Sequence, residues 1–231
     1  INMSHRGILE QYIPLVSYIH EIVGSDCEVI LHDTNQPDSS IIALAGNLSK
    51  RHLGGPLTDL ALEVLQSKSY LTEAHITNYK SMLQDGRICR SSSYYIKDTE
   101  DKLIGMLCIN ILVSDLIDIR NKIDGLIGLK DLSALIAPTS VKPAKQEERL
   151  GQNIDELMGT LISEVLNNFS GDTAELSPRV KESIIAELEK KGVFLLKGGV
   201  MEVAKSIEMS EPSVYRYLAK IKHEDRTSPA N

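Results

Sequence analysis

The residues with the clearest chemical pattern lie near the C-terminus, in the stretch VMEVAKSIEMSEPSVYRYLAKIK from Val200 to Lys222. Two short runs with helical apolar spacing are separated there by the polar residues SEP. Ser210 is a residue type that caps helices, and Pro212 suits the first turn of the helix that follows. We therefore predict two helices joined by a tight turn, with the second helix beginning just after Ser210.

The outward side of this second helix offers groups that hydrogen-bond to nucleic acid. An arginine can donate two bonds to a guanine or a phosphate, and serine and tyrosine hydroxyls can bond to phosphate oxygens. A plain helical hairpin with a solvated charged face is the alternative. We predict that the face binds double-stranded DNA through Ser210, Glu211, Ser213, Tyr215, Arg216 and Lys220.

Two helices must cross closely if one of them is to enter the major groove. Ala204 supplies the small residue that a close crossing needs. One position departs from the usual pattern, because Glu208 stands where glycine often eases the turn. The apolar residues predicted to face inward are Val203, Ile207, Met209, Val214, Tyr217 or Leu218, and Ile221.

The charge of the chain divides into two parts. The whole chain of 231 residues has a net charge of −7, with 42% hydrophobic residues, enough for one large or two small domains. Up to Ser177 there are 15 Lys and Arg against 24 Asp and Glu, whereas from Pro178 onward there are 10 against 8. An acidic first part and a mildly basic second part indicate two units with different partners.

Several classes of protein are disfavoured by composition. No apolar run approaches the roughly 20 residues of a membrane helix, and the first residues do not resemble a secretory signal. The three cysteines, Cys27, Cys89 and Cys108, lack a metal-binding spacing and fit reduced thiols. We therefore expect a cytoplasmic protein without a membrane segment.

The elements before residue 114 predict an α+β fold. Apolar spacing predicts a helix over residues 8–24, kinked by Pro14, and another over residues 57–68. Two β-rich runs precede the second helix and three follow it, and Asp85-Gly86 is a hairpin turn. We predict a five-stranded antiparallel sheet with helices on one side, a sensor-like arrangement, built from residues 27–33, 41–47 and three runs between 74 and 113.

A further helix is predicted from Ser114 to about residue 129. Its apolar stripe faces either a partner chain or its own sheet, and the sequence leaves both open. The stripe consists of Leu116, Ile119, Ile123, Leu126 and Ile127.

Residues 137–150 are rich in proline, serine and charge and read as a linker. We therefore divide the chain into a sensor domain at 1–136, the linker at 137–150, and a helical DNA-binding unit at 151–231. A homodimer is expected because two recognition helices read two half-sites. Ile123 and Leu157 are chosen as probes, since charge at either should dissociate a dimer built on its helix.

Polar residues in otherwise apolar strands are candidates for holding a small effector. We predict a site for an amino acid or another small polar molecule at His32, Asn78, Ser92 and Asn110. The alternative is that Asn110 bonds to neighbouring backbone and the serines face water.

Enzymatic and redox functions have weaker support. The sequence lacks a Ser-His-Asp constellation, a phosphate loop and a paired-carboxylate motif, so we expect no catalytic residue, no metal and no cofactor. Alternatives are a small metal-binding enzyme, with zinc or haem near His32-Asp33, or a protein-interaction module with a helical tail. Cys89 lies beside Arg87 and Arg90 and close to Cys108 in the predicted sheet, which allows a thiol switch.

Beyond this reading, SVYRYL and the preceding VMEVAKSIEMSEP resemble the helix-turn-helix of DauR-like bacterial regulators. The segments CEVILHD, ALAGN, GGPLTDLALEVL, NYKSMLQDGRICRSSSYYIKD and LIGMLCIN resemble the YheO-like PAS domain, in the same order. The resemblance spans almost the whole chain. It implies a PAS-type sensor fused to a DNA-binding domain, acting as a transcriptional regulator. In some members of the family, the regulated genes serve the use of amino acids.

Overall fold

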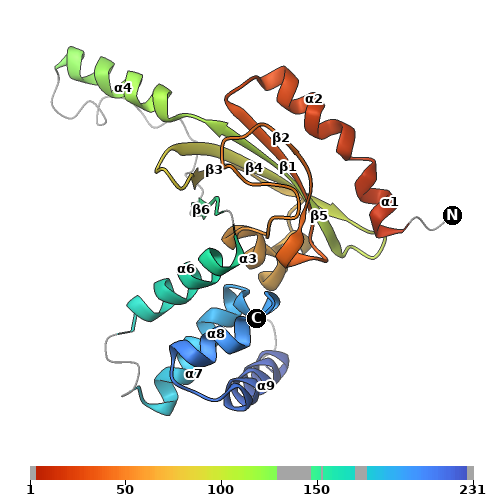
Figure 1. The fold of residues 1–231 in the computed structure, drawn as a ribbon, viewed down its shortest axis with the longest axis vertical. Helices are drawn as coiled ribbons and strands as arrows, with labels where there is room; N and C mark the ends of the chain where they lie inside the picture. Colours follow the sequence, from red (N-terminus) through yellow and green to blue (C-terminus); the bar gives the residue numbers. More distant parts are fainter. Residues whose placement is uncertain (1–3, 129–146, 152, 170–175, 228–231) are drawn as a thin grey trace.

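The computed structural model describes residues 4–128, 147–151, 153–169 and 176–227. Its first part is built on one sheet, and its last part is a group of helices (Figure 1). The strands are β1 (Cys27–Asp33), β2 (Ile41–Ala45), β3 (His75–Met82), β4 (Ile88–Lys97), β5 (Leu103–Leu112) and β6 (Glu147–Arg149). Their order in the sheet is β2-β1-β5-β4-β3-β6.

The predicted α+β fold class is confirmed, and the first five strands pair antiparallel. Strand β6 was not expected. It pairs parallel with β3 at the edge of the sheet and lies in the last residues of the predicted linker. Residues 137–146 of that predicted linker lie outside the described residues. The three-residue strand was missed because EER has neither β-branched residues nor alternation.

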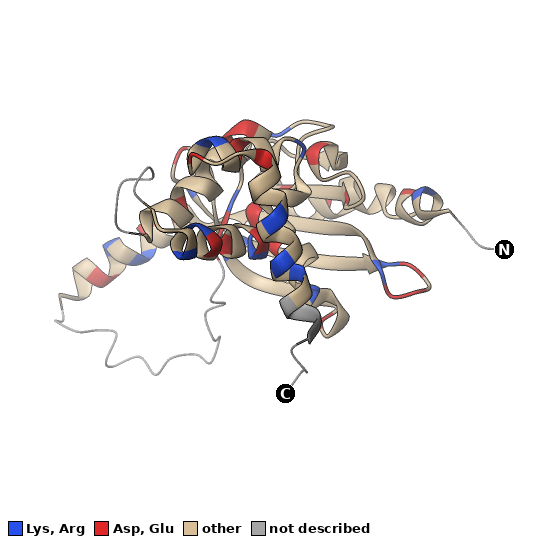
Figure 2. Ribbon diagram, turned by 90° about the horizontal axis from the view of Figure 1, so that it is seen from below, with Lys and Arg blue, Asp and Glu red and all other residues tan. Residues whose placement is uncertain are grey.

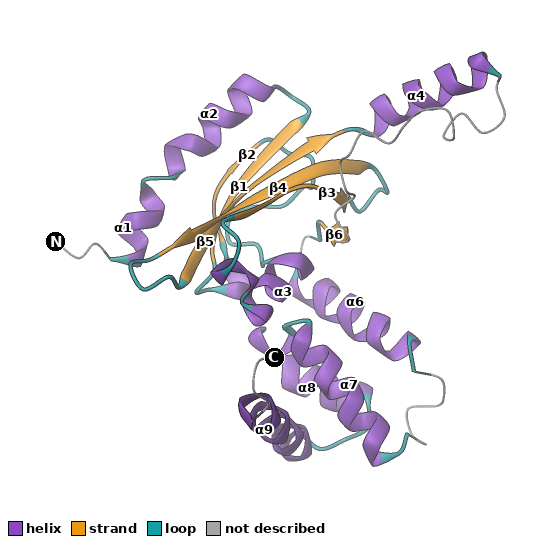
Figure 3. Cartoon of the chain, turned by 180° about the vertical axis from the view of Figure 1, so that it is seen from behind, coloured by secondary structure: helices purple, strands orange, loops and turns teal. Residues whose placement is uncertain are grey.

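Helices cover both faces of the sheet, so the prediction of helices on one side was wrong. Helices α1 (His5–Glu10) and α2 (Ile13–Val23) pack on one face, and α3 (Asp59–Ser67) lies on the other (Figure 3). All seven residues of β1 are buried as a result. The break between α1 and α2 precedes Pro14, which occupies the first turn of α2. Short 3-10 turns lie at Pro37–Ser39 and Ser69–Leu71.

Helix α4 (Ser114–Ile127) leaves the end of β5 and projects away from the sheet (Figures 1 and 3). None of its residues is buried. Of the two expectations for its apolar stripe, packing back on its own sheet is therefore wrong.

The C-terminal part consists of α6 (Ile154–Asn167), α7 (Pro178–Lys190), a 3-10 turn at Val193–Leu195, α8 (Gly199–Ser206) and α9 (Glu211–Thr227). Asn153 caps α6 by accepting a bond from the Glu156 N–H at 2.8 Å, and Ser177 caps α7. Asparagine and serine are among the residue types that most often cap helices. Across the described residues, each helix is either too short or too polar to cross a membrane.

One hydrophobic core joins the sheet to the C-terminal helices. It runs from Tyr79 and Tyr95 on the sheet, through α3, to residues of α6, α7, α8 and α9. Gly192 follows α7 with φ +75°, and a Cβ there would lie 3.0 Å from Leu62 of α3. Leu157 belongs to this core with 7% exposure, so it cannot serve as a probe of a dimer surface.

Candidate DNA-binding and effector sites

Helices α8 and α9 form the predicted pair, with a core of the expected residues. Ala204 is buried at the crossing, and its carbonyl accepts a bond from the Met209 N–H at 2.9 Å. Leu218, rather than Tyr217, is the fully inward residue of α9, and Tyr217 is half-buried beside it. The other buried members are Val203, Ile207 and Val214.

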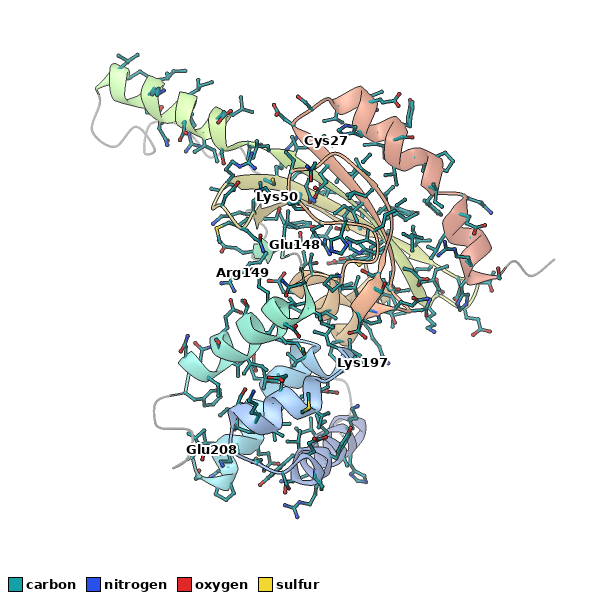
Figure 4. All side chains as sticks on the ribbon, in the orientation of Figure 1. Cys27, Lys50, Glu148, Arg149, Lys197 and Glu208 are labelled. Atoms are coloured by element: carbon teal, nitrogen blue, oxygen red, sulfur yellow. The ribbon has the colours of Figure 1, made fainter. Side chains whose placement is uncertain are left out.

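Glu208 stands at the position where such turns often have glycine, and its backbone adopts a conformation that glycine favours. Its φ is +50°, in the left-handed region that favours glycine. Its carbonyl faces α7, where it accepts a bond from the Lys181 ammonium at 3.4 Å. Figure 4 shows Glu208 at the end of the helical part far from the sheet. The turn is therefore formed by a residue that is strained there, which is why glycine is more usual.

Helix α9 begins as predicted. The Ser210 carbonyl accepts bonds from the N–H groups of Ser213 and Val214, which places Ser210 at the cap position. The Ser210 and Ser213 hydroxyls lie 3.0 Å apart. Glu211, Tyr215 and Arg216 are exposed on the outward side, and Ser213 is half-buried.

The contacts of two lysines near this face were not predicted from the sequence. Lys220 is paired with Glu182 of α7 at 2.5 Å, so its ammonium is held against the protein. Lys181, which the sequence analysis did not single out, lies beside the turn through its bond to Glu208. Only the packing of α7 against α9 reveals Lys181, because it is 30 residues earlier in the chain than Glu211. Figure 2 shows Lys and Arg recurring along the helix that runs to the C-terminus.

The four predicted effector residues do not come together. His32 and Asn110 are buried, and their side chains belong to the sheet face that also carries Ser91 and Ser93. Asn78 and Ser92 contact each other instead, with the Ser92 hydroxyl accepting from the Asn78 N–H at 3.1 Å in a partly exposed position. The alternation of a strand places Ser92 on the opposite face from its neighbours.

A chain of hydrogen bonds between buried polar groups covers the face that carries Asn110. Asn110 donates to Glu28 at 3.4 Å and accepts from Ser91 at 2.8 Å. Glu28 in turn accepts from the N–H and hydroxyl of Ser49 at 2.9 and 2.7 Å. Ser81 continues the chain by bonding to Ser91. The alternative for Asn110 assigned it a backbone partner, whereas its partners here are side chains.

Two buried side chains beside this chain of hydrogen bonds have an atom without a hydrogen-bond partner among the described residues. They are Nε of Arg51 and Oε2 of Glu148, and each residue is only 4% exposed. The terminal Nη2 of Arg51 donates to the Pro56 carbonyl, and the Thr58 hydroxyl donates to Oε1 of Glu148 at 2.5 Å. Buried polar atoms are rarely left unpaired, so these two mark a place for a further polar group.

Burial governs the electrostatics of this cluster. Burial, with a smaller contribution from the Asp59 charge, raises the pKa of Glu148 to about 7, against the opposing influence of the Thr58 and Tyr79 hydroxyls and the Arg51 charge. Burial also lowers the pKa of Arg51, while neighbouring carboxylates, Glu148 first, raise it. The pKa of His32 lies well below its ordinary value because of burial and the nearby Arg51 charge, so the ring is neutral and bonds to the Ser40 hydroxyl at 2.8 Å.

Strand β6 connects this cluster to the helical part. Figure 4 shows Glu148 between the sheet and the helices, with Arg149 next to it. Arg149 forms an ion pair with Glu164 of α6, and Glu164 also lies 3.5 Å from Lys191 at the end of α7. The Arg149 N–H donates to Asp59 of α3 at 3.1 Å. Adjacent residues of one strand therefore contact the interior of the sheet domain and the C-terminal helices.

The thiol switch is contradicted. Cys89 pairs with Leu112 and Cys108 pairs with Ser93, so the two thiols lie four positions apart along the ladder. Both are buried, and burial raises the pKa of Cys89 to about 11 and that of Cys108 to about 12. Such thiols are unreactive. The described residues also contain no group of three or more His, Cys, Asp or Glu side chains that could hold a metal.

Comparison with known proteins agrees with this geometry. Residues 3–128 match the YheO-like PAS domain family. The chain belongs to the YheO-like PAS domain family. Residues 157–219 match a helix-turn-helix domain family, which covers the α8–α9 pair and the helices that support it.

Several relatives align with nearly the whole of this chain. The protein YheO of Escherichia coli K12 is 23% identical over 94% of this chain and 86% of its own length. A protein of Haemophilus influenzae is 24% identical over 95% and 93% of the two chains. The transcriptional regulator DauR of Pseudomonas aeruginosa is 26% identical over 95% and 97%. The resemblance seen in the sequence is thus confirmed.

Proposed function

We propose that this protein is a DNA-binding transcriptional regulator whose α9 reads an operator and whose PAS domain senses a small molecule. The observation that supports DNA binding is the outward side of α9, where Tyr215 and Arg216 are exposed above a buried contact with α8. The name of the relative DauR supports regulation of transcription. The PAS domain of the family supports sensing.

In the proposed complex, the first half of α9 enters the major groove. Arg216 bonds to a guanine edge or a phosphate, and Tyr215, Ser213 and Ser210 bond to phosphates. Glu211 suits a cytosine amino group. Lys220 contributes only if its pair with Glu182 opens, and Lys181 is the better-placed phosphate contact because it lies beside the turn.

Further parts of the proposal follow from the class of protein. Two recognition helices would read two half-sites, so the functional form is a homodimer. We place it in the cytoplasm of a bacterium, where operator DNA lies. The resemblance to DauR-like regulators favours genes of amino-acid metabolism as the targets.

The test is binding of a promoter fragment from the gene's own neighbourhood, measured against an unrelated fragment of equal length. We expect preference for the promoter fragment, with an affinity that falls steeply as salt rises because phosphate contacts release counterions. Equal binding to both fragments, at every salt concentration and with each candidate effector, would exclude a sequence-specific regulator. An unchanged affinity in Arg216→Ala would remove Arg216 from the contact.

For the effector, we propose that the site lies inside the sheet domain at Arg51 and Glu148, with His32 and Asn110 on the same side. The supporting observation is the pair of unpartnered buried atoms, one a donor and one a carboxyl oxygen. A small polar molecule that offers an acceptor to Arg51 and a donor to Glu148 would complete both. Asn78 and Ser92 then fall outside the site.

This part is tested with the protein as purified. Small molecules released on denaturation are identified by mass spectrometry, and a panel of amino acids is screened by thermal shift. Glu148→Gln should weaken binding, whereas Asn78→Ala should not. Well-ordered water alone at Arg51 and Glu148 in an experimental map, together with no shift across the panel, would overturn the site.

A further inference from the structure

Helix α4 carries a stripe of apolar side chains that the described residues leave exposed. It is 14 residues long, and none of those residues is buried. Leu126 is 87% exposed and Leu116 is 64% exposed, and the other three members of the stripe are about half exposed. An isolated helix of this length is marginally stable in water, and contiguous exposed apolar surface marks a contact. Another surface must therefore cover α4.

The spacing of the stripe fits a second helix. Leu116, Ile119, Ile123 and Leu126 follow one another at intervals of three, four and three residues, the repeat of a coiled-coil seam. The opposite side of the helix is mostly polar and includes Asp118, Asn121 and Gly125. A narrow seam of this kind matches a helix rather than a flat sheet or a pocket.

The charges beside the stripe fit a second copy of α4. Asp115 and Lys122 flank it on one side, and Arg120 flanks it on the other. If two copies run antiparallel, residues on the same flank meet, and Asp115 faces Lys122 of the second copy. If they run parallel, opposite flanks meet five residues apart, and Asp115 faces Arg120 of the second copy. Each arrangement gives two opposite-charge contacts, because a twofold interface repeats every contact.

We propose that α4 is the dimerisation helix, and that it pairs with α4 of a second copy along the seam of Leu116, Ile119, Ile123 and Leu126. The pairing supplies the dimer that the proposed function calls for, but its test needs no DNA. Failure to dimerise through α4 and failure to bind an operator are therefore separate results. The competing occupants are residues 129–146 of the same chain and a different protein.

The first experiment measures the mass of the full chain by light scattering over a range of concentrations. Leu116→Glu is compared with Leu53→Glu, because both leucines are 64% exposed and neither change disturbs a core. We expect a dimer for the unaltered chain and for Leu53→Glu. We expect the dissociation constant of Leu116→Glu to rise by about a hundredfold or more, since two buried charges are introduced per dimer.

A monomer in the unaltered chain would overturn the proposal in favour of cover by residues 129–146 or by another protein. A dimer that survives both Leu116→Glu and Ile123→Glu unchanged would place the interface elsewhere. Circular dichroism establishes that each variant is folded.

A second experiment determines the orientation. The three native cysteines are buried, so an introduced surface cysteine can be oxidised selectively. In a parallel pair Leu116→Cys crosslinks to itself, as does Leu126→Cys, because each meets its own counterpart. In an antiparallel pair only a mixture of the two variants crosslinks. No crosslink in any of the three samples contradicts pairing along this seam.

Charge reversal gives an independent readout. Asp115→Lys should weaken the dimer, and adding Arg120→Glu should restore it if the helices are parallel. Adding Lys122→Glu should restore it if they are antiparallel. Equal weakening in all three variants would contradict the proposed contacts.

Discussion

The sheet domain and the helical domain place their charged groups in opposite ways. Glu28, Arg51 and Glu148 are buried within the first domain, at 0–4% exposure. In the second domain the side chains proposed to bind DNA, such as Arg216, are exposed to solvent. Buried charges are tuned by their neighbours and respond to a change among them, whereas exposed charges keep ordinary properties and are available to a partner. The difference gives a physical basis for assigning the proposed sensing to the first domain and the proposed DNA binding to the second.

The largest effect that tests this comparison is expected at Arg51. Arg51→Met keeps much of the volume but leaves Glu148 and Glu28 without their buried cation, and it removes the donor to the Pro56 carbonyl. We expect the free energy of unfolding to fall by about 3–5 kcal/mol in urea titration. Lys50→Met, at the exposed neighbouring position, should change it by less than about 0.5 kcal/mol. Similar small losses in both variants would mean that the buried charge is not coupled to its surroundings.

The second effect concerns the pH dependence of stability. Glu148 has a folded-state pKa of about 7, above its ordinary value of 4.5, so between these pH values the folded state holds a proton that the unfolded state lacks. Stability therefore falls as pH rises from about 4.5 to about 7, by on the order of 3 kcal/mol. Glu148→Gln should remove this decline.

For Glu148, the free energy of unfolding is measured at pH 5 and at pH 8 for the variant and for the unaltered protein. The difference between the two free energies is then compared between the two pH values. Glu147→Gln is the matched control, because Glu147 is exposed and Lys80 holds its pKa below the ordinary value. Its difference should stay constant between pH 5 and pH 8. A constant difference for Glu148→Gln as well would show that this carboxyl does not titrate in that interval.

In the helical domain the expected effect is on binding and not on stability. Arg216→Ala should weaken promoter binding by about 1–3 kcal/mol, which is roughly 5- to 150-fold, and leave the unfolding free energy within about 0.5 kcal/mol. Lys190→Ala, an exposed cation at the far end of α7, is the control for general charge. Equal losses of affinity in the two variants would indicate attraction by net charge alone.

The smallest effect is expected at the turn between α8 and α9. Glu208→Gly relieves a positive φ and should raise the unfolding free energy by about 0.5–1 kcal/mol in thermal or urea unfolding. Glu202→Gly, within α8, should lower it by a similar amount because glycine weakens a helix interior. Destabilisation in both variants would mean that the Glu208 side chain has a stabilising contact that outweighs the strain.

The elements that depend on local pattern were predictable from the sequence. Strands β1 to β5, the cap Ser210 and the inward residues of α8 and α9 all follow from alternation, cap chemistry and helical spacing. The features that depend on distant contacts were not. Arg51 and Glu148 come from a loop and from an edge strand 97 positions later, and nothing in either local sequence indicates burial.

The same limit explains the misplaced site residues. Asn78 and Ser92 were grouped with Asn110 because all three are polar and lie in strands. The face of the sheet on which each side chain lies depends on the strand register, however. Asn78 itself has φ +59° at a break in the β3–β4 ladder, which the sequence did not reveal. Lys220 was expected on the DNA face, and its pairing with Glu182 depends on how α7 packs.

Strand β6 has a consequence for cutting and recombining this chain. Cleavage of the chain between Gly128 and Glu147 would produce one piece that contains five strands of the sheet and a second piece that contains the sixth strand. The second piece would still be held by the β3–β6 ladder, the contact of Gly192 with Leu62 of α3 and the bond that the Arg149 N–H donates to Asp59. The two pieces should therefore remain associated and copurify. A helix-turn-helix unit transplanted from residue 151 onward would leave behind the strand that ties it to the sheet.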